Sequence, residues 1–363
     1  MSTYTREALF QMLEAVKKPD EQAMAASRKH WDNIAKPIYG LGLMEDMIVK
    51  IAGIQGKEQV VLDKKAVIVM CSDNGVVAEG VTQTDSHVTA VVTENFARGI
   101  ASVNRMAAVA GAEVLPVDIG VAEDLTEPGV RSCKIAYGTR NLAKEPAMSE
   151  EQAVRAILTG IRLVEECREK GYDLLATGEM GIGNTTTSSA MASVLLNLPV
   201  ESVTGKGAGL SADGIRHKVQ VIEAAIRLQK PDRNDPLSVL AGLGGFDLAG
   251  MTGVFLGGAL YHVPVVIDGI ISSVAALTAA RLCPTAVGYM LASHMSKEPA
   301  SVMIMKELGL EPVIHGKLAL GEGTGAVMLF PLLEMAYQVY LENSTFENIQ
   351  IEAYEHFEQE DVL

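Results

Sequence analysis

The sequence predicts an α/β fold in which a mostly parallel sheet is covered by helices on both faces. Short apolar segments alternate with helical segments from residue 65 onward, as in a chain of β-α units. With 48% hydrophobic and 21% charged residues, the chain can bury a sizeable core, and its composition excludes a disordered protein. Glycine is abundant at 34 residues and aromatic residues make up only 5%, which favours a tightly packed α/β enzyme over an aromatic-rich β-sandwich.

The expected elements follow one another along the chain. Amphipathic patterns predict N-terminal helices at 8–16, 22–34 and 41–54, with a break at Lys36-Pro37. Four short apolar runs predict strands at 66–70, 112–118, 173–176 and 265–267. Helices are expected at 88–110, 150–170, 188–196, 215–229, 272–280 and 326–342. The region 248–267 lacks Lys, Arg, Asp and Glu, and we interpret it as a buried helix and strand because Pro264 interrupts any membrane span.

Charge and cysteine usage exclude several classes of protein. The formal net charge is −15, which argues against a nucleic-acid partner because binding phosphate backbones requires a basic face. The four cysteines form no CxxC pair, so a structural zinc, a redox dithiol or a disulfide framework is not expected. We interpret them as buried thiols in a reducing cytoplasm. The N-terminus lacks the apolar core of a signal peptide.

Glycine-rich and acidic segments follow the predicted strands, where α/β proteins bind ligands. After 173–176 comes the run Gly181 to Thr186, which leads into a helix and suits an anion, because free N–H groups gather at a helix start. A tight turn capped by Asn or Thr explains the same residues equally well. Asp268 follows the strand at 265–267. No HxH or HExxH pair is present, so a metal site is not expected, although the turn at His294 has the polarity to meet a ligand.

Two further segments carry candidate chemistry. Gly207 to Ala212 fits the pattern G-x-G-x-x-A, yet no clear strand precedes it, so a dinucleotide site is a minor alternative. Lys218, farther along, reads by itself as a solvated lysine. Glu322 lies between glycines in an apolar setting, where a raised pKa would suit a general base. The alternative is a helix N-terminal Glu favoured by the helix dipole.

Taken together, these segments resemble the nicotinate-nucleotide–dimethylbenzimidazole phosphoribosyltransferase family, which activates the lower-ligand base of cobamides. The matching runs keep one order within residues 36–335: GEMGIGNTT at 178–186, GGFD at 244–247, 264–273, SH and EP at 293–294 and 298–299, and LGEGTG at 320–325. The resemblance implies a Rossmann-like α/β domain over 61–330 and a small helical domain built from 1–60 and 331–363. It also implies a homodimer, with a heterodimer containing a paralogous chain as the alternative.

The resemblance further implies a reaction and a set of site residues. Nicotinate mononucleotide would donate its phosphoribosyl group to a base, releasing nicotinate and giving an α-ribotide. Glu322 would be the general base, with Glu179 and Lys218 positioning substrates and balancing charge. The donor is expected at Gly181, Gly183, Asn184, Thr185, Thr186, Gly205, Gly207, Asp268 and Ser296. The acceptor base is expected at Asp73, Thr82, Ser86 and Leu320. No cofactor and no metal are implied.

Three segments depart from the family pattern. The motif KPxGSLGxLE reads KPIYGLGLME at 36–45, DHG reads DNG at 73–75, and SxYPQE reads TQTDSH at 82–87. These changes cluster where the base is expected, so the acceptor stays open between dimethylbenzimidazole or a related base and a purine or phenolic compound, in the last case with a paralogous partner chain. A dinucleotide-dependent oxidoreductase and a non-catalytic partner subunit are the remaining alternatives.

Overall fold

In the computed structural model of the chain, which describes residues 4–207 and 209–356, the central feature is a six-stranded parallel sheet. The strands lie in the order β3-β2-β1-β4-β5-β6, and every neighbouring pair is parallel. Their bounds are β1 (Lys65–Ser72), β2 (Ala112–Gly120), β3 (Arg131–Ser132), β4 (Leu174–Met180), β5 (Val265–Ile267) and β6 (Met290–Ala292). The expected α/β, Rossmann-like fold class is confirmed.

The order of the strands reverses at the centre of the sheet. From β1 the chain adds β2 and β3 on one side, and from β4 it adds β5 and β6 on the other. The crevice beyond the carboxyl ends of β1 and β4 is therefore the switch point where such sheets bind ligands. All eight residues of β1 are buried, as a central parallel strand covered on both faces requires.

Helices connect and cover the strands. The α-helices are α1 (Arg6–Leu13), α2 (Glu21–Asn33), α3 (Leu43–Gln55), α4 (His87–Ala97), α5 (Ser102–Val109), α6 (Glu150–Glu169), α7 (Asn184–Leu196), α8 (Val200–Val203), α9 (Ala212–Gln229), α10 (Pro236–Leu243), α11 (Phe246–Tyr261), α12 (Ile270–Leu282), α13 (Ala300–Leu308) and α14 (Thr324–Glu342). The 3-10 helices are η1 (Gly75–Glu79) and η2 (Pro284–Tyr289).

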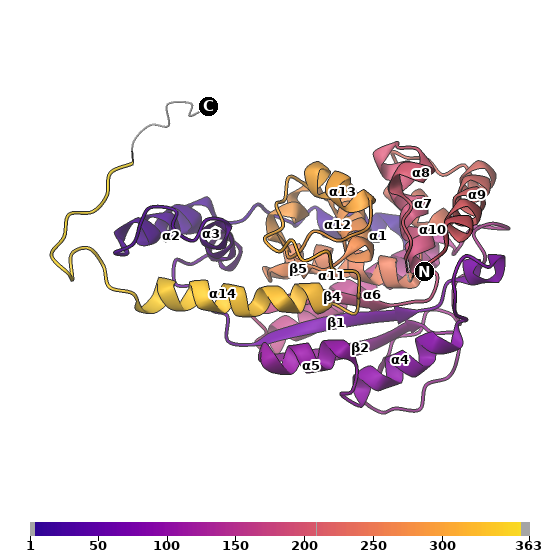
Figure 1. Cartoon of the computed structure of the whole chain (residues 1–363), viewed down its shortest axis with the longest axis horizontal. Coiled ribbons are helices and arrows are strands. Elements are labelled where there is room, and N and C mark those ends of the chain that lie inside the picture. The colour runs from indigo at the N-terminus through magenta and orange to yellow at the C-terminus, as the bar shows by residue number, and fades with distance from the viewer. Residues whose placement is uncertain (1–3, 208, 357–363) are drawn as a thin grey trace. The chain divides into compact units, whose positions relative to one another are not determined.

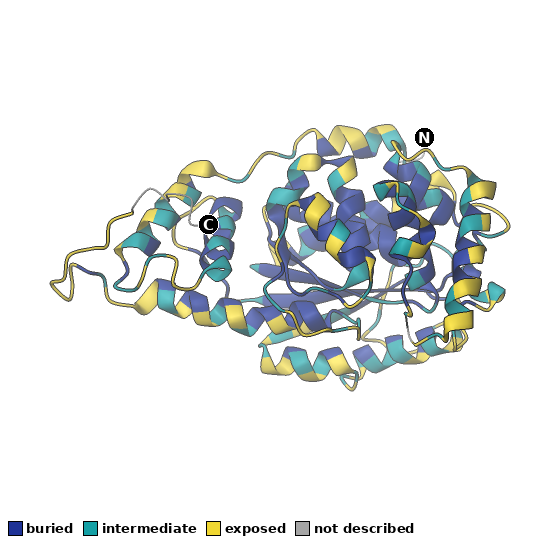
Figure 2. Ribbon diagram, turned by 45° about the horizontal axis from the view of Figure 1, so that its top comes forward, coloured by how far each residue is buried: buried dark blue, intermediate teal, exposed yellow. Residues whose placement is uncertain are grey.

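The two faces of the sheet are covered by different helices. Helices α4 and α5 pack on β2 on one face, while α11 and α12 pack on β1, β4 and β5 on the other (Figure 1). Buried residues concentrate on the strands and on the helix faces turned toward them (Figure 2). This two-sided cover leaves the carboxyl ends of the strands, and the loops that follow them, free to form a site.

The helix expected at 88–110 is wrong as a single element. The structure divides it into α4 and α5, separated by residues 98–101. Gly99 takes a φ of +73°, which ends α4 because a right-handed helix does not continue through the left-handed region. Helix α7 begins at Asn184, four residues before the expected start. The strand β6 was not predicted, because three apolar residues carry little periodicity.

Residues 248–267 form the greater part of α11 and then β5, as the expected buried helix and strand. Almost every residue of α11 is buried, from Phe246 to Ala259. Across residues 4–207 and 209–356, no helix has both the length and the apolar character needed to cross a membrane.

The chain divides into two compact units. The larger unit comprises residues 1–18 and 63–329, and the smaller comprises 19–62 and 330–363. Helix α1 thus groups with the larger unit, whereas the expected small domain began at residue 1. Arg6 explains this, since its guanidinium pairs with Glu150 at 2.6 Å and Asp235 at 2.7 Å.

The smaller unit contains α2, α3 and the part of α14 from Phe330 onward. Trp31 of α2 makes an edge contact with Tyr340 of α14, their ring centroids 5.0 Å apart. The hydroxyls of Tyr337 and Tyr340 donate to the carbonyls of Val60 and Glu58 at 2.8 and 2.9 Å. Aromatic packing and these bonds join the two segments of the chain in one helical unit.

Candidate active site

A cavity of about 300 Å³ opens at the carboxyl ends of β4, β5 and β6, within the larger unit. Its volume is at the lower end of the range for small-molecule pockets, about 300–1,000 Å³. Polar lining residues come from β4, α7, the turns after β5 and β6, and the turn that leads into α14, and most apolar ones come from α4, α12 and the segment 318–320. The lining comprises Val92, Glu179, Met180, Gly181, Ile182, Asn184, Thr185, Gly207, Asp268, Gly269, Ile270, Ile271, Ser272, His294, Ser296, Glu298, Leu318, Ala319, Leu320, Gly321, Glu322 and Thr324.

Glu322 lies in a turn with left-handed backbone, at φ +63°. Its main chain lies against Gly178 of β4, where a Cβ would come within 2.5 Å of the Glu322 carbonyl oxygen. Its carboxylate Oε2 accepts the backbone N–H of Val103, in the first turn of α5, at 3.0 Å. Burial raises the pKa of Glu322, although this hydrogen bond opposes the rise. The turn and the start of α5 together hold a half-buried carboxylate at the cavity.

Two further carboxylates share one amide. The Asn184 side-chain N–H₂ donates to Asp247 Oδ2 at 3.0 Å and also to Glu179 Oε2. Burial is the main cause of the raised pKa values, about 8 for Glu179 and about 7 for Asp247. The negative charge of Asp247 raises the pKa of Glu179 further. This pair therefore holds exchangeable protons near neutral pH.

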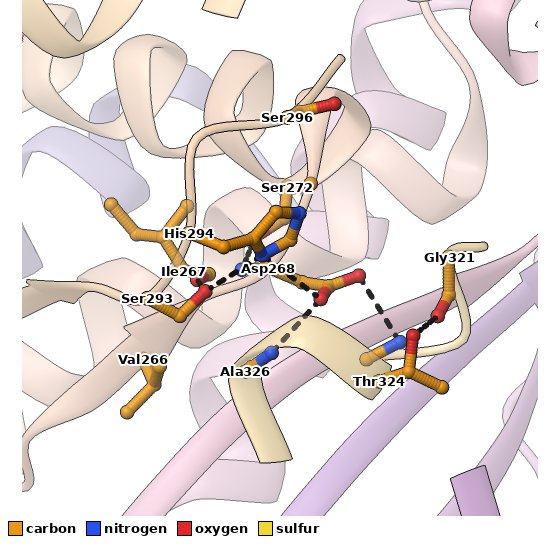
Figure 3. Close-up of polar contacts among 12 residues, drawn as sticks. Val266, Ile267, Asp268, Ser272, Ser293, His294, Ser296, Gly321, Thr324 and Ala326 are labelled. Carbon is orange, nitrogen blue, oxygen red and sulfur yellow. Dashed lines mark hydrogen bonds and ion pairs between the residues drawn. The ribbon is translucent and has the colours of Figure 1, made fainter. Parts of the chain in front are cut away.

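Asp268 anchors the third part of the site (Figure 3). Its carboxylate accepts the backbone N–H groups of Gly323 at 3.2 Å and Ala326 at 3.0 Å, and so ties the Glu322 turn to the end of β5. The His294 imidazole lies 4.0 Å from Asp268. Burial raises the pKa of Asp268 and lowers that of His294. A Cβ on Gly325 would overlap the His294 ring, so glycine is required there.

The start of α7 forms the loop expected to hold the donor. Gly183 precedes the helix with φ +91°, and Asn184 and Thr185 line the cavity at its first turn. Lys218 of α9 is buried behind the cavity wall, where its ammonium group donates to Thr185 Oγ1 at 2.9 Å. Burial lowers the pKa of Lys218 to about 8. The lysine acts on the cavity through Thr185, and it is not the solvated residue that its sequence alone suggested.

The side chain of Glu298 lies against the second glycine-rich loop, residues 205–209. Its carboxylate accepts the backbone N–H of Gly207 at 3.1 Å, and a Cβ on Gly205 would overlap the same carboxylate. Helix α8 precedes this loop where a dinucleotide fingerprint needs a strand. Ala208, inside the G-x-G-x-x-A pattern, lies outside the described residues. This segment therefore lacks the β-α context of a dinucleotide site.

The structure brings together most of the residues proposed from the sequence. The cavity is lined by Glu179, Gly181, Asn184, Thr185, Gly207, Asp268, Ser296, Leu320 and Glu322. Gly183, Thr186, Gly205 and Lys218 lie behind this lining.

Three residues expected in the base pocket lie elsewhere. Asp73 is buried after β1 and accepts the backbone N–H of Ala122 at 2.8 Å. Thr82 donates to the carbonyl of Thr84 within an exposed turn, and Ser86 directly precedes α4. None of the three lines the cavity.

Several lining or contacting residues were not among the expected site residues, and four of them bear on the chemistry or the shape of the site. Asp247, Glu298 and His294 come from segments of the resemblance that carried no assigned role, and Val92 comes from the helical region 88–110. The signal available for Asp247 was a carboxylate one residue after two glycines, at the start of a helix that is otherwise uncharged. Among the described residues, no cluster of three or more His, Cys, Asp or Glu side chains has the geometry to hold a metal ion.

This arrangement provides the parts of a group transfer between an anionic and an aromatic ligand. The helix N-terminus and the threonine hydroxyl favour a phosphate, and the apolar side chains of Ile271, Leu318 and Leu320 favour a flat ring. Glu322, with its raised pKa, can accept a proton from a group bound beside it.

A family model described as phosphoribosyltransferase matches residues 16–351, so the chain is a phosphoribosyltransferase. Relatives named nicotinate-nucleotide–dimethylbenzimidazole phosphoribosyltransferase include those of Clostridium acetobutylicum (45% identity, 94% of this chain and 97% of the other) and Acetivibrio thermocellus (44%, 96% and 99%). A crystal structure of the Thermus thermophilus enzyme of that name superposes with a TM-score of 0.85 at 37% identity, covering 92% of this chain and 99% of the other. The chain belongs to the nicotinate-nucleotide–dimethylbenzimidazole phosphoribosyltransferase family.

Proposed function

We propose that this enzyme transfers the phosphoribosyl group of nicotinate mononucleotide to dimethylbenzimidazole or a related lower-ligand base of cobamides. Nicotinate leaves, and the product is an α-ribotide. The observation that carries the proposal is the half-buried Glu322 carboxylate, with its raised pKa, at a cavity lined by apolar side chains. Membership of the family supports the same reaction.

The chemistry follows from a donor that carries its own leaving group. The pyridinium ring of nicotinate mononucleotide leaves as neutral pyridine nitrogen when its bond to C1′ breaks and takes the bonding electron pair. A ring nitrogen of the base attacks C1′ from the opposite face, which converts a β donor into an α product. Glu322 takes the N–H proton from the other ring nitrogen and so keeps the attacking lone pair available. The protonated Glu322 then returns its proton to water.

The donor phosphate is proposed to lie against Asn184 and Thr185 at the start of α7. A helix N-terminus stabilises an anion there, and Lys218 supports the Thr185 hydroxyl from behind. The Gly207 amide is already bonded to Glu298, so phosphate reaches that loop only if the Glu298 carboxylate moves. Ser296 lies beside Glu298 on the cavity wall and is the further hydroxyl proposed to contact the donor.

The acceptor pocket is proposed to form from Val92, Ile271, Leu318 and Leu320. Apolar side chains hold an aromatic ring by burial and leave its substituents weakly discriminated, since a methyl group is worth only about 1–3 kcal/mol in such a pocket. Purine and phenolic acceptors therefore stay alternatives within the same reaction. A phenolic acceptor needs only one O–H proton removed, which the same carboxylate can accept.

The test measures nicotinate release from purified protein and identifies the ribotide by mass spectrometry. The acceptors are dimethylbenzimidazole, benzimidazole, adenine and phenol, each with nicotinate mononucleotide. Release with a ribotide of matching mass supports the proposal and ranks the acceptors. If no acceptor yields nicotinate and a ribotide, the proposed reaction is wrong for this chain alone, and the test is repeated with a paralogous chain present.

We also propose that the enzyme is a homodimer, or a heterodimer with a paralogue. Leu332 and Met335 lie one turn apart on α14 and remain exposed, at 36% and 60% of their surface. Adjacent exposed apolar side chains form a contiguous patch, and such patches are a feature of interfaces between chains. Sedimentation equilibrium of the purified chain tests this, and a mass of one chain at micromolar concentration contradicts a homodimer.

A cytoplasmic location is part of the same proposal. Cys71, Cys167 and Cys283 are buried and Cys133 is partly exposed, and all four are free thiols. Free thiols are typical of a reducing compartment. Fractionation of cells that produce the protein is expected to recover it in the cytoplasmic fraction, and recovery from the periplasm contradicts this assignment.

A further inference from the structure

A second cavity, about 370 Å³ in volume, lies at the β3 edge of the sheet, where β3 adjoins α6. It shares no lining residue with the active-site cavity. Its walls are Tyr4, Arg131, Ser132, Cys133, Lys134, Arg155, Thr159, Arg162 and Leu163. Four of these residues are basic and none is acidic, in a chain whose formal net charge is −15. This cavity is therefore a local excess of positive charge on an acidic protein.

Ion pairs within the fold neutralise only two of the four cations. Arg131 forms two hydrogen bonds to Glu166, and Lys134 lies 3.0 Å from Asp118. Arg155 and Arg162 form no ion pair with a carboxylate among residues 4–207 and 209–356, and Arg155 instead lies over the Tyr4 ring with 5.9 Å between Cζ and the ring centroid. Two guanidinium groups therefore face a shared cavity with N–H donors available to an anion.

The fold fixes the backbone positions of these two arginines, whose side chains are exposed. Arg155 and Arg162 are seven residues apart on α6, two helical turns, and so project from one face. The opposite face of α6 packs closely on α11, where a Cβ on either Gly160 or Gly253 would overlap the backbone of the other helix. Because backbones in such close contact leave little freedom to slide, α6 presents both arginines to the cavity from a fixed backbone.

We propose that this cavity is a second binding site, for a phosphomonoester of mononucleotide size. Guanidinium groups recognise phosphate by paired N–H donors, which matches Arg155 and Arg162. The exposed hydroxyl of Ser132 and the Tyr4 ring provide a hydrogen-bond group and a surface for the rest of the ligand. The volume exceeds that of the active-site cavity, so the site accommodates more than a free phosphate ion.

A smaller neighbouring cavity supports a ligand with a ring attached to its phosphate. This space, about 170 Å³, shares Arg131 and Leu163 with the basic cavity and is otherwise lined largely by apolar residues such as Ile68, Val114 and Leu115. The Arg131–Glu166 pair lies where the two cavities meet. A ligand with its phosphate at the arginines and an apolar or aromatic group near Leu163 would occupy both cavities.

Isothermal titration calorimetry with nicotinate mononucleotide and with adenosine monophosphate tests the proposal. The native enzyme is expected to bind nicotinate mononucleotide at two sites per chain. The variant Arg155→Ala/Arg162→Ala is expected to lose one of them, with binding there about tenfold or more weaker. The control is Arg168→Ala/Arg227→Ala, which removes two exposed arginines outside the cavity and is expected to bind as the native enzyme does. Loss of adenosine monophosphate binding in the same variant shows that the site accepts phosphomonoesters in general, and loss for nicotinate mononucleotide alone shows that it selects the donor.

The rate of nicotinate release and the sedimentation mass of the variant distinguish this site from the active site and from an interface between chains. The Arg155→Ala/Arg162→Ala variant is expected to release nicotinate at the native rate at saturating donor, because neither residue lines the active-site cavity. Binding equal to native in the variant overturns the proposal, as does a single site in the native enzyme for both probes. A variant that keeps both sites but changes its sedimentation mass overturns it too, since the arginines then serve an interface between chains.

Discussion

Individual carboxylates decide the chemistry of the active site. Glu179, Asp247, Asp268 and Glu322 all lie in or beside one cavity, and burial raises the pKa of each. The folded protein accommodates these buried carboxyl groups because backbone or side-chain amide N–H groups donate a hydrogen bond to each of the four. Asn184 has the central role in this arrangement, since its single amide group serves both Glu179 and Asp247.

Replacing Asn184 by Ala removes that shared donor. Two buried carboxyl groups then lose a hydrogen bond each, and we expect a loss of about 1–3 kcal/mol in the free energy of unfolding. Urea denaturation at pH 7 measures it. The matched control is Asn234→Ala, an exposed residue whose change should be nearly neutral. Equal stability of both variants would show that water replaces the amide of Asn184 without cost.

The raised pKa of Glu179 predicts that the stability of the folded protein depends on pH. Its pKa in the folded protein is about 8, raised from an ordinary value near 4.5, so the folded state binds more protons than the unfolded state between these values. Stability is therefore expected to fall as the pH rises from about 5 to 8, with a slope of up to ~1.4 kcal/mol per pH unit from this group.

The variant Glu179→Gln is expected to flatten that slope, because it keeps the shape and removes the ionisation. Denaturation series at pH 5, 6, 7 and 8 compare it with native protein and with Glu201→Gln, a change at an exposed residue of α8 that should keep the native slope. An unchanged slope in Glu179→Gln would mean that the Glu179 carboxyl ionises as freely in the folded protein as in water.

Whole elements, in turn, position these residues. The break between α4 and α5 is the clearest case, because it gives the chain a new helix start whose Val103 N–H binds Glu322. Gly99 was visible in the sequence, yet a helix tolerates an isolated glycine, so the pattern alone did not reveal the break. The new helix start makes its contact with a residue more than two hundred positions later, which no local pattern contains.

The contact between α6 and α11 is a second case in which the packing of whole helices matters. Gly253 lies against the Ile157 carbonyl, and the variant Gly253→Ala forces the two helices apart. We expect a loss of about 1–3 kcal/mol in the free energy of unfolding, in line with other overpacked cores. The control is Gly242→Ala near the end of α10, where the nearest atom to an added Cβ is 3.7 Å away. If both variants unfold at the same urea concentration, α6 and α11 adjust without cost.

At the scale of the whole molecule, the sheet order explains why the site lies where it does. The alternation of strands and helices was enough to predict a parallel sheet and a ligand site at its carboxyl edge, and Asp268 was expected there from its place after an apolar run. Glu322 was singled out by its glycine-flanked apolar setting and assigned its role by the family resemblance. Asp73, Thr82 and Ser86, which the resemblance assigned to the base pocket, lie outside the cavity, because a sequence motif does not state which way a side chain turns.

The net charge of −15 gives a prediction that involves the whole molecule. The proposed donor is an anion that approaches a negative protein through a cavity lined by the carboxyl side chains of Asp268, Glu298 and Glu322. The Debye length falls from about 30 Å at 10 mM salt to about 8 Å at 150 mM, so screening should weaken the repulsion. We expect the KM for nicotinate mononucleotide to fall as salt rises over this range. A KM that rises instead would show that Lys218 and the α7 N-terminus dominate the local field.

The central claim is that Glu322 accepts the proton of the attacking base. The most direct measurement is the initial rate of nicotinate release by Glu322→Gln at saturating donor and base, with donor binding measured in parallel by calorimetry. We predict a kcat lower by about 10²–10⁴-fold with native-like donor affinity, because glutamine keeps the side-chain shape and cannot take the proton. A near-native kcat in a variant that folds and binds donor would contradict the assignment of Glu322 as the base.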